Sequence, residues 1–281
     1  MSPTLLVVAF GMLASLGWGL ADFGGGLASR RAPVVAVLLA SQSASLLLAI
    51  PLVLVAGEPN AQPTDLARAA LGGITGAAGL GTLYHALSVG RMGVVAPVAA
   101  VVTAGMPVAF GFATQGIPSA LAIAGIALAT VAVVLVSRST GPDEGRPSGF
   151  WQAVFAGATF GLFPIITDGI SDDLLVTPVA VVRIASVATI GAFVLARRPT
   201  WRVPRRLLPA LFAIGVVDML ATAAYLSALA IGPLAIAAIL SSLYPVVTVV
   251  LAALVLRERI AAIQAVGIAA AGLAVVLIAG A

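Results

Sequence analysis

The sequence of 281 residues contains no cysteine and no lysine, and only 9% of its residues are charged. Without cysteine there is no disulfide scaffold or thiolate metal site, and without lysine there is no phosphate-binding loop of the ATPase type. Soluble domains carry about 25% charged residues, whereas this chain is 61% hydrophobic with a mean hydropathy of +1.18. That composition excludes a soluble globule and a disordered chain. We interpret the chain as an integral membrane protein.

Apolar segments of about the length that crosses a bilayer, roughly 20 residues, recur along the whole chain. Short turns or charged stretches separate them, and the hydrophilic stretch 138–149 divides the chain into near-equal halves. The pattern predicts an all-α membrane protein with ten transmembrane helices, in two units (1–137 and 150–281) joined by a cytoplasmic linker at 138–149. The predicted spans are 4–27, 33–56, 66–89, 93–114, 117–137, 150–169, 176–196, 206–231, 234–256 and 260–280.

The positive charge is distributed unevenly between the predicted loops. All 14 basic residues are arginines; twelve lie in odd-numbered loops, and Arg68 alone lies in an even-numbered loop. Cytoplasmic loops of membrane proteins carry the excess of arginine and lysine. We therefore expect a multi-pass protein of the cell (inner) membrane, with odd-numbered loops in the cytoplasm and both termini outside. The basic excess then reflects orientation in the lipid bilayer and does not indicate a nucleic-acid partner.

The second half of the sequence repeats the first. An alignment of 86–136 with 228–278 needs no gap and gives 14 identities in 51 pairs, including Gly125-Ile126-Ala127 on Gly267-Ile268-Ala269. We call the pairing at this offset of 142 residues the repeat alignment; it also places Gly19-Leu20 on Gly161-Leu162, and after a three-residue insertion in the second half Pro33-Val34 meets Pro178-Val179. A unit of five helices is an odd number, so its second copy enters the membrane upside down. We predict two inverted five-helix repeats, an arrangement that recurs in secondary transporters with the substrate site between the halves near the midplane.

Several motifs then resemble one transporter family. Trp18-Gly19, the Tyr-x-x-Ala-Leu stretch from Tyr225 before a Gly-Pro turn, and Leu243-Tyr-Pro-Val-Val-Thr248 followed by Leu256-Arg-Glu-Arg259 are similar to the EamA-type branch of the drug/metabolite transporter superfamily. The resemblance covers essentially the whole chain. It implies ten helices, no use of ATP, and export or exchange of small organic solutes driven by a gradient. The first half departs from the pattern, because Thr103 stands where the second half has Pro245.

Asp218 and Arg183 lie well inside predicted spans, where a charge costs about 2.5–3.5 kcal/mol and needs a partner or a purpose. Asp218, near the midplane, is a candidate site for a substrate amine or a proton; the alternative is a carboxylate paired for packing. Arg183 is a candidate for binding a substrate carboxylate, or else it pairs with an acid on the outer side (Asp168, Asp172 or Asp173). If both residues reach one cavity, an amino acid or similar zwitterion is the natural ligand, and if only Asp218 does, a cation is.

Further candidates are polar or aromatic residues in the spans, of which Asp22 and His85 lie towards the cytoplasmic ends of theirs and the others at interior depths. Asp22 and His85 join Asp218 as candidates for proton coupling; the alternatives are that Asp22 pairs with Arg30 or Arg31 and that His85 is an interfacial hydrogen-bonding residue. Aromatic faces can bind apolar or cationic ligands, and the hydroxyls and amide can hydrogen-bond either a substrate or a neighbouring helix. These candidate substrate-binding residues are Trp18, Tyr225, Tyr244, Ser241, Ser242 and Gln42.

The sequence therefore predicts a secondary-active transporter of small organic solutes, exporting or exchanging amino acids or related metabolites by alternating access. The alternative within the class is an exporter of drugs or quaternary cations. A non-transporting membrane protein or a channel is a further alternative. We expect no enzymatic activity and no cofactor or metal. The expected partners are the lipid bilayer, a small-molecule substrate and protons as a coupling hypothesis, with the chain as a monomer or homodimer.

Overall fold

The structure is a computed structural model that describes residues 3–89, 92–137, 149–257 and 260–281, and over these residues it is helical with no strand. The predicted all-α class is confirmed; most of the predicted linker, 138–148, lies outside the described residues. A 3-10 turn at Arg205–Leu207 precedes α8. The helices are α1 (Pro3–Ser29), α2 (Val34–Ala56), α3 (Pro63–Val89), α4 (Met92–Thr114), α5 (Ala120–Ser137), α6 (Phe150–Thr167), α7 (Val176–Arg197), α8 (Leu208–Ile231), α9 (Leu234–Ser241), α10 (Tyr244–Leu256) and α11 (Ala262–Ala279).

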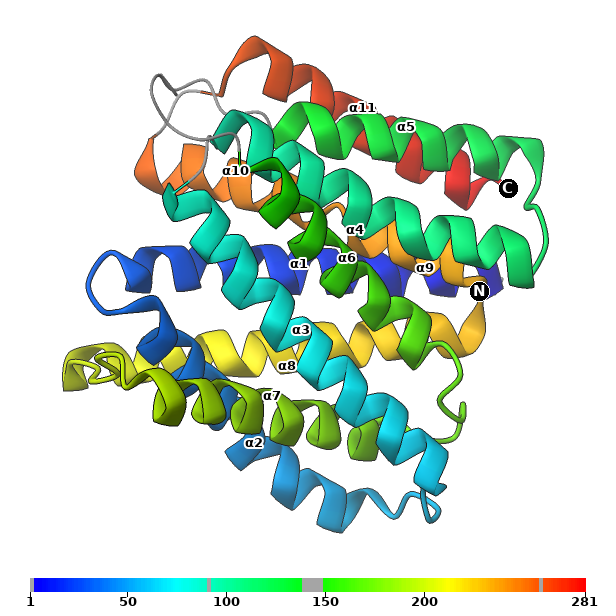
Figure 1. The fold of residues 1–281 in the computed structure, drawn as a ribbon. Coiled ribbons are helices and arrows are strands. Elements are labelled where there is room, and N and C mark those ends of the chain that lie inside the picture. Colours follow the sequence, from blue (N-terminus) through cyan, green and yellow to red (C-terminus); the bar gives the residue numbers. More distant parts are fainter. Residues whose placement is uncertain (1–2, 90–91, 138–148, 258–259) are drawn as a thin grey trace.

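Eight of the helical segments are long and apolar enough to cross a membrane, with α9 and α10 counted together as Leu234–Leu256. The segment Val98–Thr114 of α4 is a shorter apolar helix. The remaining helix, α3, carries Asp65 and Arg68 near its start and five glycines. The chain is thus a multi-pass helical membrane protein. The start of α1 and the end of α11 lie at the same end of the bundle, as an even number of crossings requires (Figure 1).

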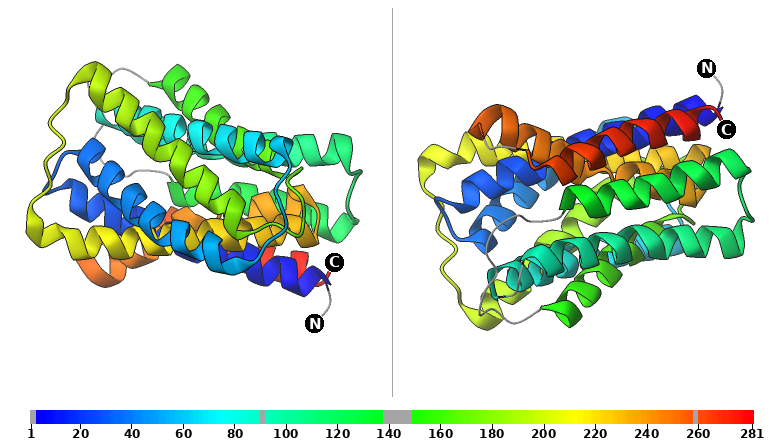
Figure 2. Two further views of the ribbon diagram at one scale, coloured as in Figure 1. Left: turned by 90° about the horizontal axis from the view of Figure 1, so that it is seen from below. Right: turned by 90° about the horizontal axis from the view of Figure 1, so that it is seen from above.

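Close backbone approaches hold the helices together. The main pairs are α1 with α8, α5 with α11, α3 with α6 and α7, α4 with α6, and α2 with α7 and α8 (Figures 1 and 2). A Cβ at Gly73 on α3 would overlap the carbonyl of Val182 on α7, and a Cβ at Gly215 on α8 would overlap the carbonyl of Ser41 on α2. Lipid offers no hydrophobic driving force between helices. Membrane helices therefore associate through close van der Waals packing, which small residues at the interface allow.

The predicted span 234–256 is broken in its middle. Helix α9 ends at Ser241 and α10 begins at Tyr244, so that Ser242 and Leu243 form a turn at membrane depth. Pro245, at the start of α10, favours an interruption here, because its ring has no N–H and clashes with the carbonyl of the residue four positions earlier. In the first half, α4 runs without a break through Thr103, the residue at the corresponding position. The break is therefore specific to the second half.

At the end of the bundle that holds both termini, the loop after α2 docks on the start of α7. Glu58 Oε1 accepts hydrogen bonds from the N–H groups of Leu175 (2.8 Å) and Val176 (2.6 Å), and Oε2 accepts one from Thr177 (2.8 Å). Partial burial opposes ionisation of Glu58, but these three donors outweigh it and lower the pKa of this carboxyl below its ordinary value. Glu58 thus caps a helix of the other half with a negative charge, the sign that a helix N-terminus favours.

We expect Glu58→Gln to lower the free energy of unfolding by about 1 kcal/mol at pH 7, since a helix N-terminus stabilises a carboxylate by roughly that amount. A group with a lowered pKa in the folded state stabilises the protein above its unfolded-state pKa. The difference between wild type and variant should therefore shrink as the pH falls below about 4.5. Thermal unfolding in detergent at pH 7 and pH 4 measures it. Asp173→Asn, an exposed acid nearby, is the matched control and should change stability little at either pH.

Candidate functional site

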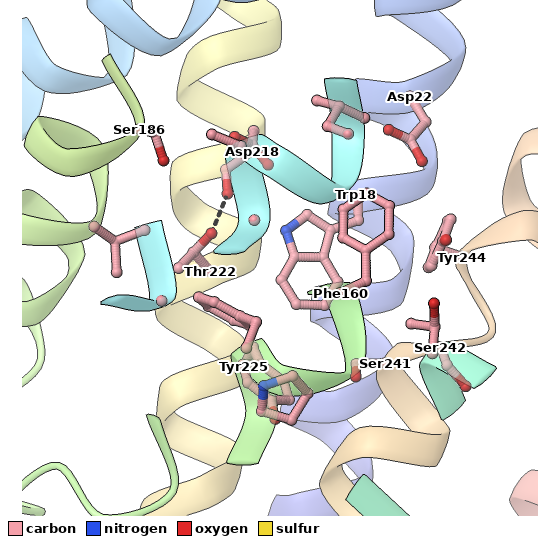
Figure 3. Close-up of a pocket in the computed structure, with 18 of the residues that line it drawn as sticks. Trp18, Asp22, Phe160, Ser186, Asp218, Thr222, Tyr225, Ser241, Ser242 and Tyr244 are labelled. Carbon is pink, nitrogen blue, oxygen red and sulfur yellow. Dashed lines mark hydrogen bonds between the residues drawn. The ribbon is translucent and has the colours of Figure 1, made fainter. Parts of the chain in front are cut away.

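A cavity of about 350 Å³ lies between the two halves of the chain. Helices α1 to α4 contribute to its wall from the first half, and α6 to α10 contribute from the second half. Such a volume is that of a site for a small organic molecule. Its wall is largely apolar, with a few polar side chains that come from α1, α7, α8 and the break between α9 and α10 (Figure 3). Among the described residues, no group of three histidines, cysteines or acids could hold a metal ion.

A buried ion pair forms one wall of the cavity. The Nη1 atom of Arg183 on α7 donates to Asp218 Oδ2 on α8 (2.6 Å) and to Gln42 Oε1 on α2 (2.7 Å). Its Nη2 atom donates to the Asp218 carbonyl oxygen (3.0 Å) and to the Thr222 hydroxyl. Gln42 Nε2 in turn donates to Asp218 Oδ2 (2.9 Å). Both charges are thereby neutralised within a network that joins three helices.

This ion pair bears on both alternatives stated for Arg183, a substrate carboxylate and an acid of the protein. One of the two alternatives for Arg183 was an ion pair with an acid on the outer side, but the acid it pairs with is Asp218. Both residues line the cavity, yet Arg183 is 4% exposed and Asp218 is 19% exposed. The Nε atom of Arg183 has no hydrogen-bond partner among the described residues. The pair is therefore mainly an internal link between helices, with Asp218 the more accessible member.

Asp22 presents the other carboxylate of the cavity. It lies one helical turn after Trp18 on α1 and faces the cavity together with Tyr244 of α10 (Figure 3). No described residue donates a hydrogen bond to Asp22 or forms an ion pair with it, and the alternative pairing with Arg30 or Arg31 is not observed. Since Arg183 compensates Asp218, the described lining residues leave one negative charge uncompensated, and it is at Asp22.

Aromatic rings form much of the remaining surface. Trp18 and Tyr225 lie with their ring centroids 5.4 Å apart, and Phe163 lies 5.8 Å from Tyr225. The Tyr225 ring is fully buried, and its hydroxyl has no partner among the described residues. Phe160 also faces the cavity (Figure 3). Trp18, Phe160 and Phe163 therefore offer partly exposed rings that can stack on an apolar or cationic ligand, whereas Tyr225 is buried behind them.

The broken helix contributes the third polar feature. Ser241 and Ser242 line the cavity, and their hydroxyls donate to the carbonyls of Ala238 (3.0 Å) and Ile239 (2.8 Å) at the end of α9. Each hydroxyl oxygen can still accept a hydrogen bond. Every substrate-binding candidate named from the sequence lies in the cavity wall, as does Asp22. His85 is exposed and is not among the residues that line the cavity.

Thr222, Phe160 and Ser186 are among the lining residues that were not singled out from the sequence. Thr222 follows Asp218 by one helical turn on the same helix face, and its hydroxyl donates to the Asp218 carbonyl at 3.0 Å. Phe160 is paired with Trp18 by the repeat alignment. Both could have been found, the first from helical periodicity and the second from the repeat. Ser186 donates to the carbonyl of Gly73, which no sequence signal indicates.

A bundle of apolar helices around a central cavity with buried charges defines a multi-pass membrane protein with a solute-sized internal site. Residues 147–280 match the EamA-like transporter family, and this part of the chain belongs to that family. The resemblance to the EamA branch of the drug/metabolite transporter superfamily, inferred from sequence motifs, is thereby confirmed. A solved structure, titled only "Crystal structure of protein", is 17% identical with a TM-score of 0.76 and covers 99% of this chain and 98% of its own. At that identity the likeness concerns the fold. None of the curated proteins matches the chain.

Proposed function

We propose that the chain is a gradient-driven carrier of small organic solutes that works by alternating access between two inverted repeats, 1–137 and 150–281. Proteins of this type place the substrate between the repeats and expose it to each side in turn. We further propose that the odd-numbered loops face the cytoplasm and both termini lie outside a cell membrane, as the arginine distribution favours. The protein would act without enzymatic chemistry or a cofactor.

Symmetry-related contacts support the inverted repeat. Exchange of the two halves turns the packing of α1 on α8 into that of α6 on α3, and the packing of α2 on α8 into that of α7 on α3, and both members of each pair are present. Helices α5 and α11 are exchanged with each other, and they pack together. A two-fold axis between the halves would produce this pattern.

The same relation holds for single glycines. A Cβ at Gly125 would meet Ile278 at 2.6 Å, and a Cβ at Gly267 would meet Val136 at 2.7 Å. The repeat alignment relates both members of the first contact to those of the second. Gly73 and Gly215, which touch carbonyls of α7 and α2, are paired by the same alignment. Packing equivalence at this detail supports duplication of the whole five-helix unit.

The proposed substrates are organic amines with an apolar body. The observation that carries this is the uncompensated carboxylate of Asp22 beside Trp18 and Tyr244 in a cavity of about 350 Å³. A charge without a partner inside a membrane protein is costly, by about 2.5–3.5 kcal/mol on insertion scales, so Asp22 favours either a proton or a cationic ligand. Aromatic faces add attraction for that cation.

Competition at one carboxylate also supplies a coupling mechanism. If Asp22 binds either a proton or the ammonium group of the substrate, each passage of a substrate one way is linked to a proton the other way. Asp218 remains the second candidate for this role, because it is the more accessible member of its pair. Its compensation by Arg183 makes it the weaker one, since a paired carboxylate has less to gain from a proton.

Amino acids are the second candidate substrates, as expected from the sequence. The observation that favours them is that Arg183 lines the cavity and that its buried Nε atom has no hydrogen-bond partner among the described residues. A substrate carboxylate could bind there while its amine binds Asp22. The other Arg183 donors are already used within the protein, so we rank this zwitterion second, above quaternary drug cations, which donate no hydrogen bond.

A pair of matched probes tests the proposal. We expect protein reconstituted in liposomes to show saturable counterflow of phenylalanine amide, a cation, at least about tenfold better than of phenylalanine, corresponding to about 1.4 kcal/mol of discrimination. An imposed proton gradient should drive accumulation of the amide. Preference for phenylalanine would favour the zwitterion, and the absence of counterflow for both probes would contradict the proposed carrier function.

A further inference from the structure

We infer that Gly76 on α3 sets the size limit of the molecule that the cavity accepts, an inference that rests on the proposed function. The described residues with which α3 lines the cavity are all small or apolar. Its lining residues are Gly72, Gly76, Ala77, Leu80 and Leu83. Helix α8 lines the same cavity with Asp218, Thr222 and Tyr225.

The glycines of α3 differ in what surrounds them. At Gly73 a Cβ would overlap the carbonyl of Val182, so packing requires glycine there, and at Gly79 it would be in tight contact with the Phe160 ring at 3.0 Å. At Gly76 a Cβ would have nothing within 4 Å, although the residue lines the cavity. The space beside Gly76 therefore belongs to the cavity, and helix packing does not require glycine there.

The repeat alignment relates the space beside Gly76 to the polar residues of α8. The repeat alignment pairs Gly76 with Asp218, and it pairs Leu80 and Leu83 with Thr222 and Tyr225. One copy of the helix carries the polar groups of the site, and the other copy carries open, apolar surface at the equivalent positions. An asymmetric ligand, charged at one end and apolar along its body, matches a cavity built in this way.

The size of the side chain at position 76 then limits the size of the ligand's apolar body. Substitution of glycine removes no polar contact and adds atoms only where the ligand would lie. Alanine is favoured over glycine within a helix, so Gly76→Ala should fold at least as well as the wild type. Larger side chains should exclude large ligands before small ones, since a pocket distinguishes ligands by single groups with factors of about ten or more.

The test uses two probes with one head group, benzylammonium and (9-anthracenylmethyl)ammonium. We expect Gly76→Val to reduce uptake of the larger probe into proteoliposomes about tenfold more than uptake of the smaller one, with Gly76→Ala intermediate. Gly81→Val is the matched control: Gly81 lies on the same helix, a Cβ there also meets nothing within 4 Å, but it is exposed and does not line the cavity. It should affect both probes equally.

Binding in detergent separates this inference from the proposed function. Trp18 is the tryptophan that lines the cavity, while Trp151 and Trp201 are exposed and can be replaced with phenylalanine. Quenching of Trp18 fluorescence then reports binding without transport. If neither probe is transported but Gly76→Val still weakens binding of the larger probe selectively, the inference stands and the carrier function fails. If the wild type transports both probes and Gly76→Val changes them equally, the inference is overturned.

Discussion

Arg183→Met is expected to lower the free energy of unfolding by about 3–5 kcal/mol, the range for removal of one partner from a buried ion pair. The variant leaves the Asp218 carboxylate uncompensated and deprives Gln42 and Thr222 of a donor. Methionine fills a similar volume without a charge, so the loss reflects electrostatics more than a cavity. Thermal unfolding of the purified protein in detergent measures the effect.

The double variant Arg183→Met/Asp218→Leu is the decisive comparison. Replacement of a whole buried pair by apolar residues is often neutral or stabilising, so the double variant should recover most of the stability lost in Arg183→Met. A double variant as unstable as the single one would contradict the paired arrangement. Arg183→Lys should recover little, because lysine lacks the planar fork that reaches Asp218, Gln42 and Thr222 together.

The helices were predictable because each is recorded in the sequence as an apolar run bounded by turn residues. The break between α9 and α10 was not, since the run 234–256 has the length of one uninterrupted span. Pro245 was visible, but a proline inside a membrane helix also produces a bend without a break. The sequence did show that the second half has Pro245 where the first half has Thr103, and α4, which contains Thr103, is unbroken.

The ion-pair partner of Arg183 could not be predicted from the sequence. Counting from the end of its segment places Arg183 near the outer face, where Asp168, Asp172 and Asp173 were the nearest acids by depth. A helix that is apolar on all sides carries little information about its rotation, since hydrophobic periodicity requires a polar face. The direction in which Arg183 points is set by packing against α2 and α8, which the sequence does not specify.

Depth and residue type were nevertheless enough to select the cavity wall. A polar or aromatic side chain at the centre of a span has to face other helices or a cavity, because facing lipid is costly. That reasoning applies to Gln42, Ser241 and Ser242 alike, and all three line the cavity. It does not apply to Glu58, which lies in a loop, where no burial constraint distinguishes it from its neighbours.

Asp22→Asn is expected to weaken binding of phenylalanine amide by roughly 10–100-fold, equivalent to about 1.5–3 kcal/mol for a hydrogen bond to a charged group. In the wild type, protons and the amine compete for one carboxylate, so the apparent affinity should rise with pH and binding should release protons. Asparagine keeps the shape but binds no proton, and both effects should disappear. Titration in weakly buffered detergent solution, followed by Trp18 fluorescence and a pH indicator, measures them together.

Asp218→Asn is the matched control, because it removes the other carboxylate of the same cavity. We expect it to lower stability by leaving Arg183 without its acid, while proton release on binding persists. If Asp218→Asn abolished proton release and Asp22→Asn preserved it, Asp218 and not Asp22 would be the proton-coupling carboxylate. We expect the first outcome because of Arg183. Its guanidinium donates to Asp218 at 2.6 Å and already supplies the positive charge that a proton or an amine would bring. The carboxylate with no such partner is the one whose occupancy has to change during transport.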